Sequence, residues 1–267
     1  LHAVGQTVIQ TLFNLMKNTL DSIALTMLRP ALSPLQLMQL CRQAGDATAL
    51  VDNYDRLEEV LPSPSDKLKT VFQSMPDALD RAKMELDFCE KHQIQVLIPT
   101  DTAYPQRLKN CEDAPLVLYY RGNADLNSAR IINIIGTRRC TFYGQEIIKN
   151  FIKDIKSASP DTLIVSGLAY GIDICAHRNA LANGMKTVGV LAHGLDMIYP
   201  SMHRETAKEM LSCGGLLTEY PQLTRPDKRN FVQRNRIVAG MSDASILVES
   251  ASHGGGLITC GISTGYG

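Results

Sequence analysis

Two glycine-containing turns, each directly after a short apolar run, are the segments of this sequence best suited to hold an anion. Residues 131–135 lead into GTR at 136–138, and residues 163–165 lead into SGLAYGID at 166–173. Short runs rich in Ile and Val are typical of buried parallel strands. A strand, a glycine turn and a helix in succession point backbone N–H groups and a helix N-terminus at an anion. In one parallel sheet, both turns would share a crevice at the carboxyl ends of the strands.

The side chains in these turns favour phosphate binding over catalysis. Neither turn is a Walker A loop, and no G-x-G-x-x-G fingerprint follows the first strand, which argues against a P-loop ATPase or a dehydrogenase. Arg138 is suited to a bidentate grip on phosphate, although it could instead pair with a surface carboxylate. Asp173 lies near a helix start, where the macrodipole favours a carboxylate, so we expect capping rather than catalysis. We expect His177 to pack or to form a hydrogen bond.

The strongest local charge lies in RPDKRNFVQRNR at 225–236. This stretch holds five basic residues and one acidic residue in a chain of zero net charge, with Phe231 at its centre. A basic groove with one aromatic side chain suits single-stranded nucleic acid, because cations bind phosphates and the ring stacks on a base. The alternative is a solvated loop with Phe231 in the core. Composition alone supports the two interpretations equally.

A third glycine turn and two carboxylates complete the set of candidate residues. Gly254, Gly255 and Gly256 stand between an expected strand and an expected helix, which would make another anion-binding turn. Glu219 and Glu249 each follow an expected strand. As a pair they could perform acid–base chemistry. We favour a different role, in which they orient the arginines of the basic stretch.

The composition argues against several classes of protein. The chain has 267 residues and seven cysteines, with no CxxC pair, so a zinc site or a disulfide framework is not expected and a reducing cytoplasm fits. No apolar run reaches the roughly 18–20 residues of a membrane span. The first residues lack the pattern of a signal peptide, and no initiator Met is present.

The order of expected elements predicts a small all-helical domain over residues 1–85, followed by an α/β domain over 86–267. Residues 1–75 read as short helices with a break at 62–65, and a further helix is expected at 77–92. Strands at 95–98 and 116–120 would be edge additions, separated by a polar turn. Strands then alternate with helices, which predicts a parallel sheet. The expected strands are 131–135, 162–166, 187–191, 216–218 and 244–248, and the helices are 143–156, 172–183, 201–213 with Ser201 as N-cap, 231–240 and one after Gly256.

These motifs, in this order, resemble the DNA-processing protein DprA (Smf) family. The resemblance rests on IIGTRR with the following YG, VSGLAYGIDICAHRNAL, GVLAHGLDMIYPSMHRE, LLTEYP, NFVQRNRIVAG and GGGLIT, and it covers about residues 85–267. It implies an extended Rossmann-like domain with helices on both faces of the sheet. It also implies a non-enzymatic, cytoplasmic homodimer that binds and protects single-stranded DNA and helps to load the RecA recombinase during natural transformation, with no cofactor.

Carried over by position, the resemblance assigns DNA or phosphate contacts to matching residues of this sequence. They are Gly136, Thr137, Arg138, Ser166, Gly167, Gly171, Arg229, Asn230, Phe231, Arg234, Asn235, Arg236, His253, Gly254 and Gly255.

The sequence departs from the family pattern in three places. Ser252-His253 stands where a basic residue such as Lys is usual, which would either remove one phosphate contact or make it pH-dependent through His253. The helical region 1–85, SAM- or helix-hairpin-helix-like in the family, lacks the hairpin glycines. The winged-helix-like domain that often ends the family's chains is not in this sequence, so we expect a truncated C-terminus. Two alternatives stay open: a nucleotide-binding enzyme or sensor of a related Rossmann-like fold, and a dimer scaffold for another DNA-binding part.

Overall fold

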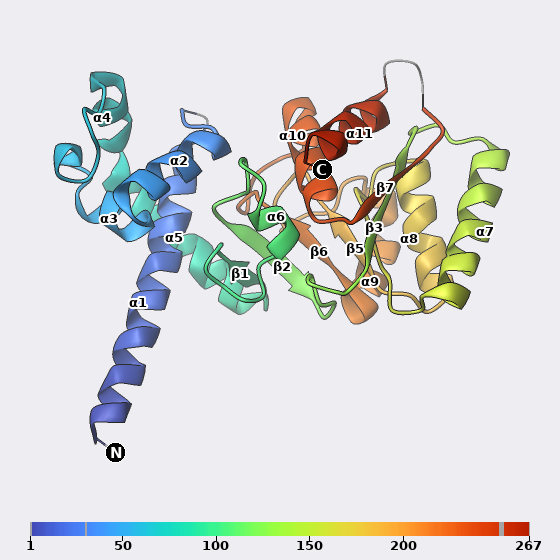
Figure 1. Cartoon of the computed structure of the whole chain (residues 1–267), viewed down its shortest axis with the longest axis horizontal. Coiled ribbons are helices and arrows are strands. Elements are labelled where there is room, and N and C mark those ends of the chain that lie inside the picture. Colours follow the sequence, from blue (N-terminus) through green and yellow to red (C-terminus); the bar gives the residue numbers. More distant parts are fainter. Residues whose placement is uncertain (1, 30, 251–253, 267) are drawn as a thin grey trace. The chain divides into compact units, whose positions relative to one another are not determined.

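The computed structural model describes residues 2–29, 31–250 and 254–266, with side chains from residue 13 onward. The chain divides into two compact units (Figure 1). The first comprises the chain up to Thr100 together with Glu112–Val117. The second comprises Asp101–Cys111 and the chain from Leu118 onward.

The first unit is helical apart from one short strand. Its elements are α1 (His2–Met27), α2 (Pro34–Ala44), α3 (Ala47–Asp52), the 3-10 turn η1 (Leu57–Glu59), α4 (Asp66–Phe72), α5 (Met75–Lys91) and β1 (Gln95–Leu97). The Ser33-Pro34 start signal of α2 is confirmed, because Ser33 forms a capping box with Gln36 and Pro34 occupies the first turn. The identification of this region as SAM- or helix-hairpin-helix-like stays a prediction.

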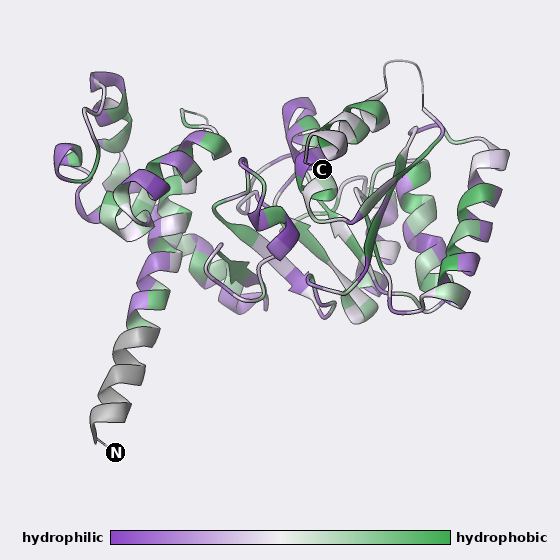
Figure 2. Cartoon of the chain, in the orientation of Figure 1, coloured by the Kyte–Doolittle hydropathy of each residue, from purple (hydrophilic) through white to green (hydrophobic). Residues whose placement is uncertain are grey.

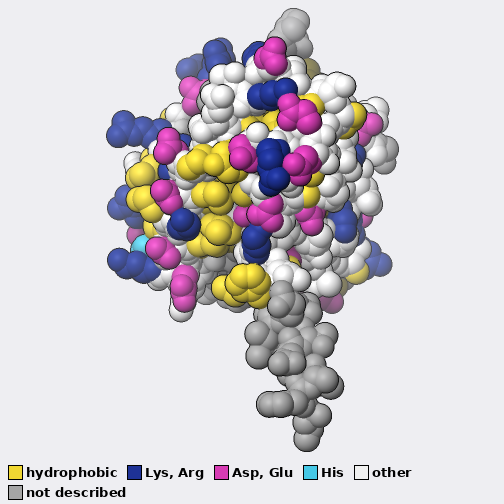
Figure 3. Space-filling model, turned by 90° about the vertical axis from the view of Figure 1, so that its left-hand side faces the viewer, with side chains coloured by type: hydrophobic (Ala, Val, Ile, Leu, Met, Phe, Trp, Pro, Cys, Tyr) yellow, Lys and Arg dark blue, Asp and Glu magenta, His cyan; other side chains and the backbone are white. Residues whose placement is uncertain are grey.

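The expectation of only short helices before residue 75 is wrong for α1. This helix has 26 residues, because no proline interrupts it and its C-terminal part is buried at Ile23, Ala24 and Leu25. The N-terminal part of the unit exposes apolar side chains, including Phe13 and Met16. Figure 3 looks onto the side of the molecule where hydrophobic side chains lie among acidic and basic ones.

The second unit contributes six strands to the sheet, in the order β2-β6-β5-β4-β3-β7. All neighbours are parallel except β2, which runs antiparallel to β6. The expectation of an α/β fold with a parallel sheet is therefore confirmed, with β2 as the antiparallel addition. The strands are β2 (Leu118–Gly122), β3 (Ile131–Gly136), β4 (Leu163–Ser166), β5 (Thr187–Val190), β6 (Gly214–Thr218) and β7 (Ala244–Val248).

Helices cover both faces of this sheet, as Figure 1 shows. On one face α7 (Phe142–Ala158) packs on α8 (Ile172–Ala182), and α8 packs on α9 (Arg204–Cys213). On the other face, α10 (Lys228–Gly240) packs on α11 (Gly255–Tyr266) and on the short α6 (Gln106–Lys109). The chain moves outward from β3 to β6 and then returns to place β7 beside β3. The strand order therefore reverses between β3 and β7, which is where ligands bind in such sheets.

The core lies between the sheet and the helices. Ile134 and Ile164 pack with Ile148 and Ile152 of α7 and with Ile172 of α8, and all five side chains are fully buried. Figure 2 shows α7 as hydrophobic on one side and hydrophilic on the other. This amphipathic pattern explains why the 3-4 spacing of apolar residues predicted the helix.

Several boundaries differ from the prediction. The polar turn before β2 contains α6, which its composition did not reveal. Residues 201–213 form a 3-10 turn, η2 (Ser201–His203), followed by α9. Ser201 is not an N-cap, because it is the first residue of η2 and Pro200 takes the N-cap position, while His203 is the N-cap of α9. α10 begins at Lys228 rather than 231. None of the helices in the described ranges is both long and apolar enough to cross a membrane.

Candidate functional site

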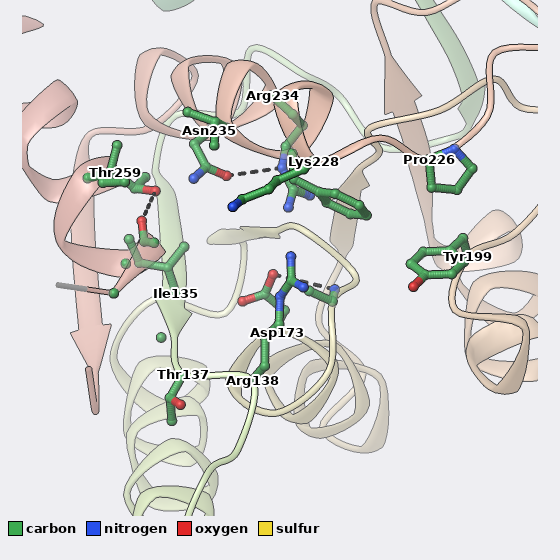
Figure 4. A pocket seen from close by; sticks show the side chains of 18 of the residues that line it. Ile135, Thr137, Arg138, Asp173, Tyr199, Pro226, Lys228, Arg234, Asn235 and Thr259 are labelled. Carbon is green, nitrogen blue, oxygen red and sulfur yellow. Dashed lines mark hydrogen bonds between the residues drawn. The ribbon is translucent and has the colours of Figure 1, made fainter. Parts of the chain in front are cut away.

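A groove of about 840 Å³ opens at the carboxyl ends of β3 and β7, at the reversal of strand order. The turn after β3 forms one wall, and the start of α10 forms the other. Figure 4 shows Arg138 and Asp173 facing Lys228, Arg234 and Asn235 across this space. The groove brings together eight of the predicted site residues: Gly136, Thr137, Arg138, Phe231, Arg234, Asn235, Gly254 and Gly255.

The first glycine turn is held tightly against the strand beside it. The Thr137 N–H donates a hydrogen bond to the Glu249 carbonyl (2.9 Å), just beyond β7. A Cβ on Gly136 would collide with the Val248 carbonyl oxygen, so only glycine permits this approach. The turn leaves the Arg138 side chain exposed and free to project along the groove wall.

The serine and the two glycines of the second turn support the structure beneath the groove, whereas Ala169 and Asp173 of the same turn line it. The Ser166 hydroxyl donates to the Ile134 carbonyl (2.6 Å), and its side chain is fully buried. Gly171 has φ +77°, and a Cβ there would overlap the backbone of Thr137 and Arg138. The Ile172 N–H donates to the Thr137 carbonyl (3.1 Å), which joins the two turns directly. Ser166 and Gly171 therefore support β3 and the first turn from beneath, and Gly167 leaves room for the Arg234 side chain.

Two aromatic rings and one guanidinium form a cluster in the groove. The Arg138 Cζ lies 5.0 Å from the centroid of the Phe231 ring, in cation–π geometry. The Phe231 and Tyr199 centroids are 6.0 Å apart. Phe231 is half-buried, so neither sequence-based interpretation of it holds alone: it packs at the groove wall and still faces the open space.

Tyr199 is a groove residue that the sequence reasoning missed. It lies in the long loop after β5, 42% exposed, and precedes Pro200. An aromatic side chain in a loop at the carboxyl edge of the sheet was the available signal. Arg225 and Lys228, also exposed, line the same groove.

Arg234 is buried under the groove, only 4% exposed. Its guanidinium donates to the Gly167 carbonyl (2.6 Å) and to the Val190 carbonyl, and its Nε donates to the Asn235 side chain (3.2 Å). Burial lowers the pKa of Arg234, while the nearby Asp173 carboxylate opposes that shift. The phosphate contact predicted for Arg234 is therefore corrected, because its guanidinium donates to backbone carbonyls.

Asp173 lies in the first turn of α8 and faces the groove floor. Burial raises the pKa of its carboxyl, and Arg234 counteracts this rise. The predicted capping role is corrected, because Gly171 takes the N-cap position and Asp173 accepts a hydrogen bond from the Ala169 N–H (3.4 Å). Asp173 thus stabilises the second turn ahead of the helix.

Arg236 also points inward. It donates to Glu219 at 2.8 Å, with the side chains 8% and 2% exposed. The hypothesis that a carboxylate orients the arginines of the basic stretch is confirmed for Glu219. It is wrong for Glu249, which accepts hydrogen bonds from the Thr141 N–H (2.9 Å) and hydroxyl at the start of α7. The phosphate contact predicted for Arg236 is corrected accordingly.

The remaining candidates do not line the groove or lie outside the described residues. Arg229 is exposed and Asn230 half-buried on α10, and neither lines the groove. His253 lies outside the described residues. His177 is fully buried and its Nδ1 lies 2.7 Å from the Thr187 hydroxyl, which confirms the predicted hydrogen-bonding role. Burial lowers the pKa of His177 to about 3.

Comparison with known proteins identifies the family of the chain. A family described as "DNA recombination-mediator protein A" matches residues 95–267. The chain belongs to this family. The resemblance to the DprA (Smf) family drawn from the motifs is therefore confirmed.

Among curated proteins, the chain is 35% identical over 190 residues to DNA processing protein DprA of Streptococcus pneumoniae, a match that covers 71% of this chain and 65% of that protein. It is 40% identical over 157 residues to DprA of Bacillus subtilis, covering 58% of this chain and 52% of that protein. The chain thus spans about half to two thirds of the length of these relatives.

Two solved structures share the fold. The crystal structure of S. pneumoniae DprA has a TM-score of 0.68 at 29% identity and covers 88% of this chain and 84% of that one. DNA processing protein A of Helicobacter pylori, described for its mode of binding single-stranded DNA, has a TM-score of 0.59 at 30% identity, with coverage of 65% and 77%.

The contact between the two glycine turns predicts a large cost for a side chain at Gly171. Gly184 is the matched control, because it also has positive φ (+61°) but nothing lies within 4 Å of its Cβ position. We expect Gly184→Ala to lower the free energy of unfolding by about 1 kcal/mol. Gly171→Ala should cost at least about 2 kcal/mol more, measured by urea denaturation. Equal losses would contradict the close packing of the turns.

The buried ion pair predicts that Arg236 acts on stability. Arg236→Ala leaves Glu219 buried without this partner, so we expect the free energy of unfolding to fall by about 3–5 kcal/mol. Arg229→Ala, on the exposed side of the same helix, should change it by no more than about 0.5 kcal/mol. Chemical denaturation of both variants measures the difference. An Arg236→Ala variant as stable as the parent would refute the assignment.

Proposed function

We propose that the groove binds single-stranded DNA, and that the protein protects incoming DNA and mediates its recombination in natural transformation. The observation that carries this proposal is the composition of the groove: a cation–aromatic cluster of Arg138, Phe231 and Tyr199 beside the exposed Arg225 and Lys228. Cations for phosphates and rings for bases are the two requirements for holding a single strand without reading its sequence.

The charge distribution favours this ligand. The chain has zero net charge, so nonspecific attraction by the whole protein is weak. Arg138 and Lys228 lie on opposite walls of the groove, and Arg225 also lines it. A strand passing between the walls would meet cations on both sides. The buried Arg234 adds positive charge beneath it.

Whether a residue lines the groove or is buried beneath it predicts its role in DNA binding. Gly136, Thr137, Gly254 and Gly255 would offer backbone and hydroxyl donors to phosphate, and Asn235 a side-chain amide. Ser166 and Gly171 would act indirectly, by shaping the first turn, and Gly167 by accommodating Arg234. Arg234 and Arg236 would position α10. The pH-dependent phosphate contact of His253 stays a prediction.

A nucleotide-binding enzyme or sensor is the competing proposal. A groove of about 840 Å³ could hold a mononucleotide, and the buried Asp173 on its floor is the group that could take part in acid–base chemistry. Exposed cations on two opposite walls favour a polymer, because a mononucleotide needs only one or two of them. Whether a DNA strand or a mononucleotide binds in the groove therefore distinguishes the two proposals directly.

The proposal also includes the part that the protein plays in the cell. The family description supports a part in recombination. Help in loading RecA, homodimerisation, a cytoplasmic location and the lack of catalysis rest on the resemblance to the DprA (Smf) family. Because the chain spans only part of its curated relatives, these properties of the whole protein are proposals for this chain.

The binding test uses fluorescence anisotropy of labelled oligo-dT at several salt concentrations. We expect salt-sensitive binding that neither duplex DNA nor free nucleotides displace. Lys228→Ala should weaken binding and make the slope of log K against log salt shallower by about 0.7, the value for one phosphate contact on a single strand. Lys153→Ala, an exposed lysine on α7, serves as the control and should leave both quantities unchanged.

Two outcomes would contradict the proposal. Displacement of the strand by a mononucleotide would support the nucleotide-binding alternative. An equal effect of Lys228→Ala and Lys153→Ala would move DNA binding away from the groove.

A further inference from the structure

We propose that the strand continues from the groove over the start of α7, where exposed side chains bind further nucleotides. We call Arg139, Phe142 and Tyr143 the α7 track. This inference rests on the proposed function, because it extends the same ligand beyond the groove. It adds a second contact surface that the groove residues do not include.

The exposure of two consecutive aromatic residues is the first observation. Phe142 is 77% exposed and Tyr143 is 72% exposed, whereas Phe231 in the groove is half-buried. Large aromatic rings normally bury most of their surface, so two that lie together in solvent indicate a binding surface. Stacking on a base would cover the faces of both rings, and every base offers such a face.

Continuity with the groove is the second observation. Arg138 lines the groove and Arg139 follows it directly, also exposed. The Arg139 N–H donates to the Thr137 hydroxyl (3.2 Å), which ties the turn together. Only Cys140 and Thr141 separate Arg139 from Phe142. A nucleotide leaving the groove past Arg138 therefore meets another cation and then two aromatic rings.

The α7 track is also held rigidly. Thr141 is the N-cap of α7 and accepts a hydrogen bond from the Gly144 N–H (3.1 Å). Glu249 accepts hydrogen bonds from the Thr141 N–H and hydroxyl, and these bonds lower the pKa of its carboxyl, so it is charged at neutral pH. A Cβ on Gly144 would lie 2.6 Å from the Glu249 Oε2, so the glycine leaves room for this carboxylate.

The position of Glu249 decides what part of the strand can bind here. A helix N-terminus normally attracts phosphate, but at α7 a carboxylate of the protein already occupies it. The nearby phosphates are therefore left to Arg139, and the bases to Phe142 and Tyr143. Stacking rather than backbone hydrogen bonding should dominate the affinity of the α7 track.

The test compares two lengths of oligo-dT, about 4 and about 16 nucleotides, which bracket the site sizes of known single-strand binders. In anisotropy titrations of the full chain, we expect Phe142→Ala/Tyr143→Ala to raise the Kd of the longer oligonucleotide by at least about 5-fold. The Kd of the shorter one should be unchanged. Phe13→Ala, an aromatic residue 62% exposed on α1, is the control and should alter neither.

The other possible results distinguish a failure of the α7 track from a failure of the proposed function. An unchanged Kd for the longer oligonucleotide overturns the α7 track, and so does an equal loss for both lengths, which would mean a disturbed groove. If the parent protein binds neither oligonucleotide, the proposed function fails as well. As a second measurement, 5-iodo-deoxyuridine placed near one end of the longer oligonucleotide should photo-crosslink to Phe142 or Tyr143, and crosslinks found only elsewhere overturn the inference.

Discussion

The position of α10 depends on one buried guanidinium. Arg234 donates to the carbonyls of Gly167 and Val190, at the carboxyl ends of two adjacent parallel strands, β4 and β5. A Cβ on Gly167 would collide with this guanidinium, so the glycine of the second turn and the arginine of the helix require each other. A buried charge is tolerated only with such partners. Through this contact the sheet edge sets where Lys228 and Phe231 stand relative to the first glycine turn.

Some basic residues of α10 are buried and others are exposed to solvent. Arg234 and Arg236 are buried and hydrogen-bonded to carbonyls or paired with Glu219, whereas Lys228 and Arg229 are exposed. This division lets a chain of zero net charge concentrate positive potential at one groove. Replacing a buried arginine should therefore lower the stability of the protein, whereas replacing an exposed basic residue of the groove should lower its affinity for DNA.

Much of the second unit could be predicted from sequence, because its strands are short apolar runs closed by glycine turns and α7 is strongly amphipathic. The location of the groove could be predicted too, because both glycine turns follow strands of one parallel sheet and so lie at the carboxyl ends of its strands. The start of α10 did not follow, since a polar stretch capped by Asp227 has the composition of a loop. Burial of Arg234 and Arg236 could not be predicted either, because it depends on partners 17 to 67 residues away in the chain. Tyr199 joined the site through a loop whose path no local pattern indicates.

The most direct test of the account is hydrogen–deuterium exchange of the full chain with and without oligo-dT. A DNA strand bound in the groove would lie against the first glycine turn and the start of α10, so peptides covering 136–141 and 225–235 should gain protection. Peptides covering α2 to α4 in the first unit should exchange at the same rate in both states. Protection confined to the first unit, with the groove peptides unchanged, would contradict the account.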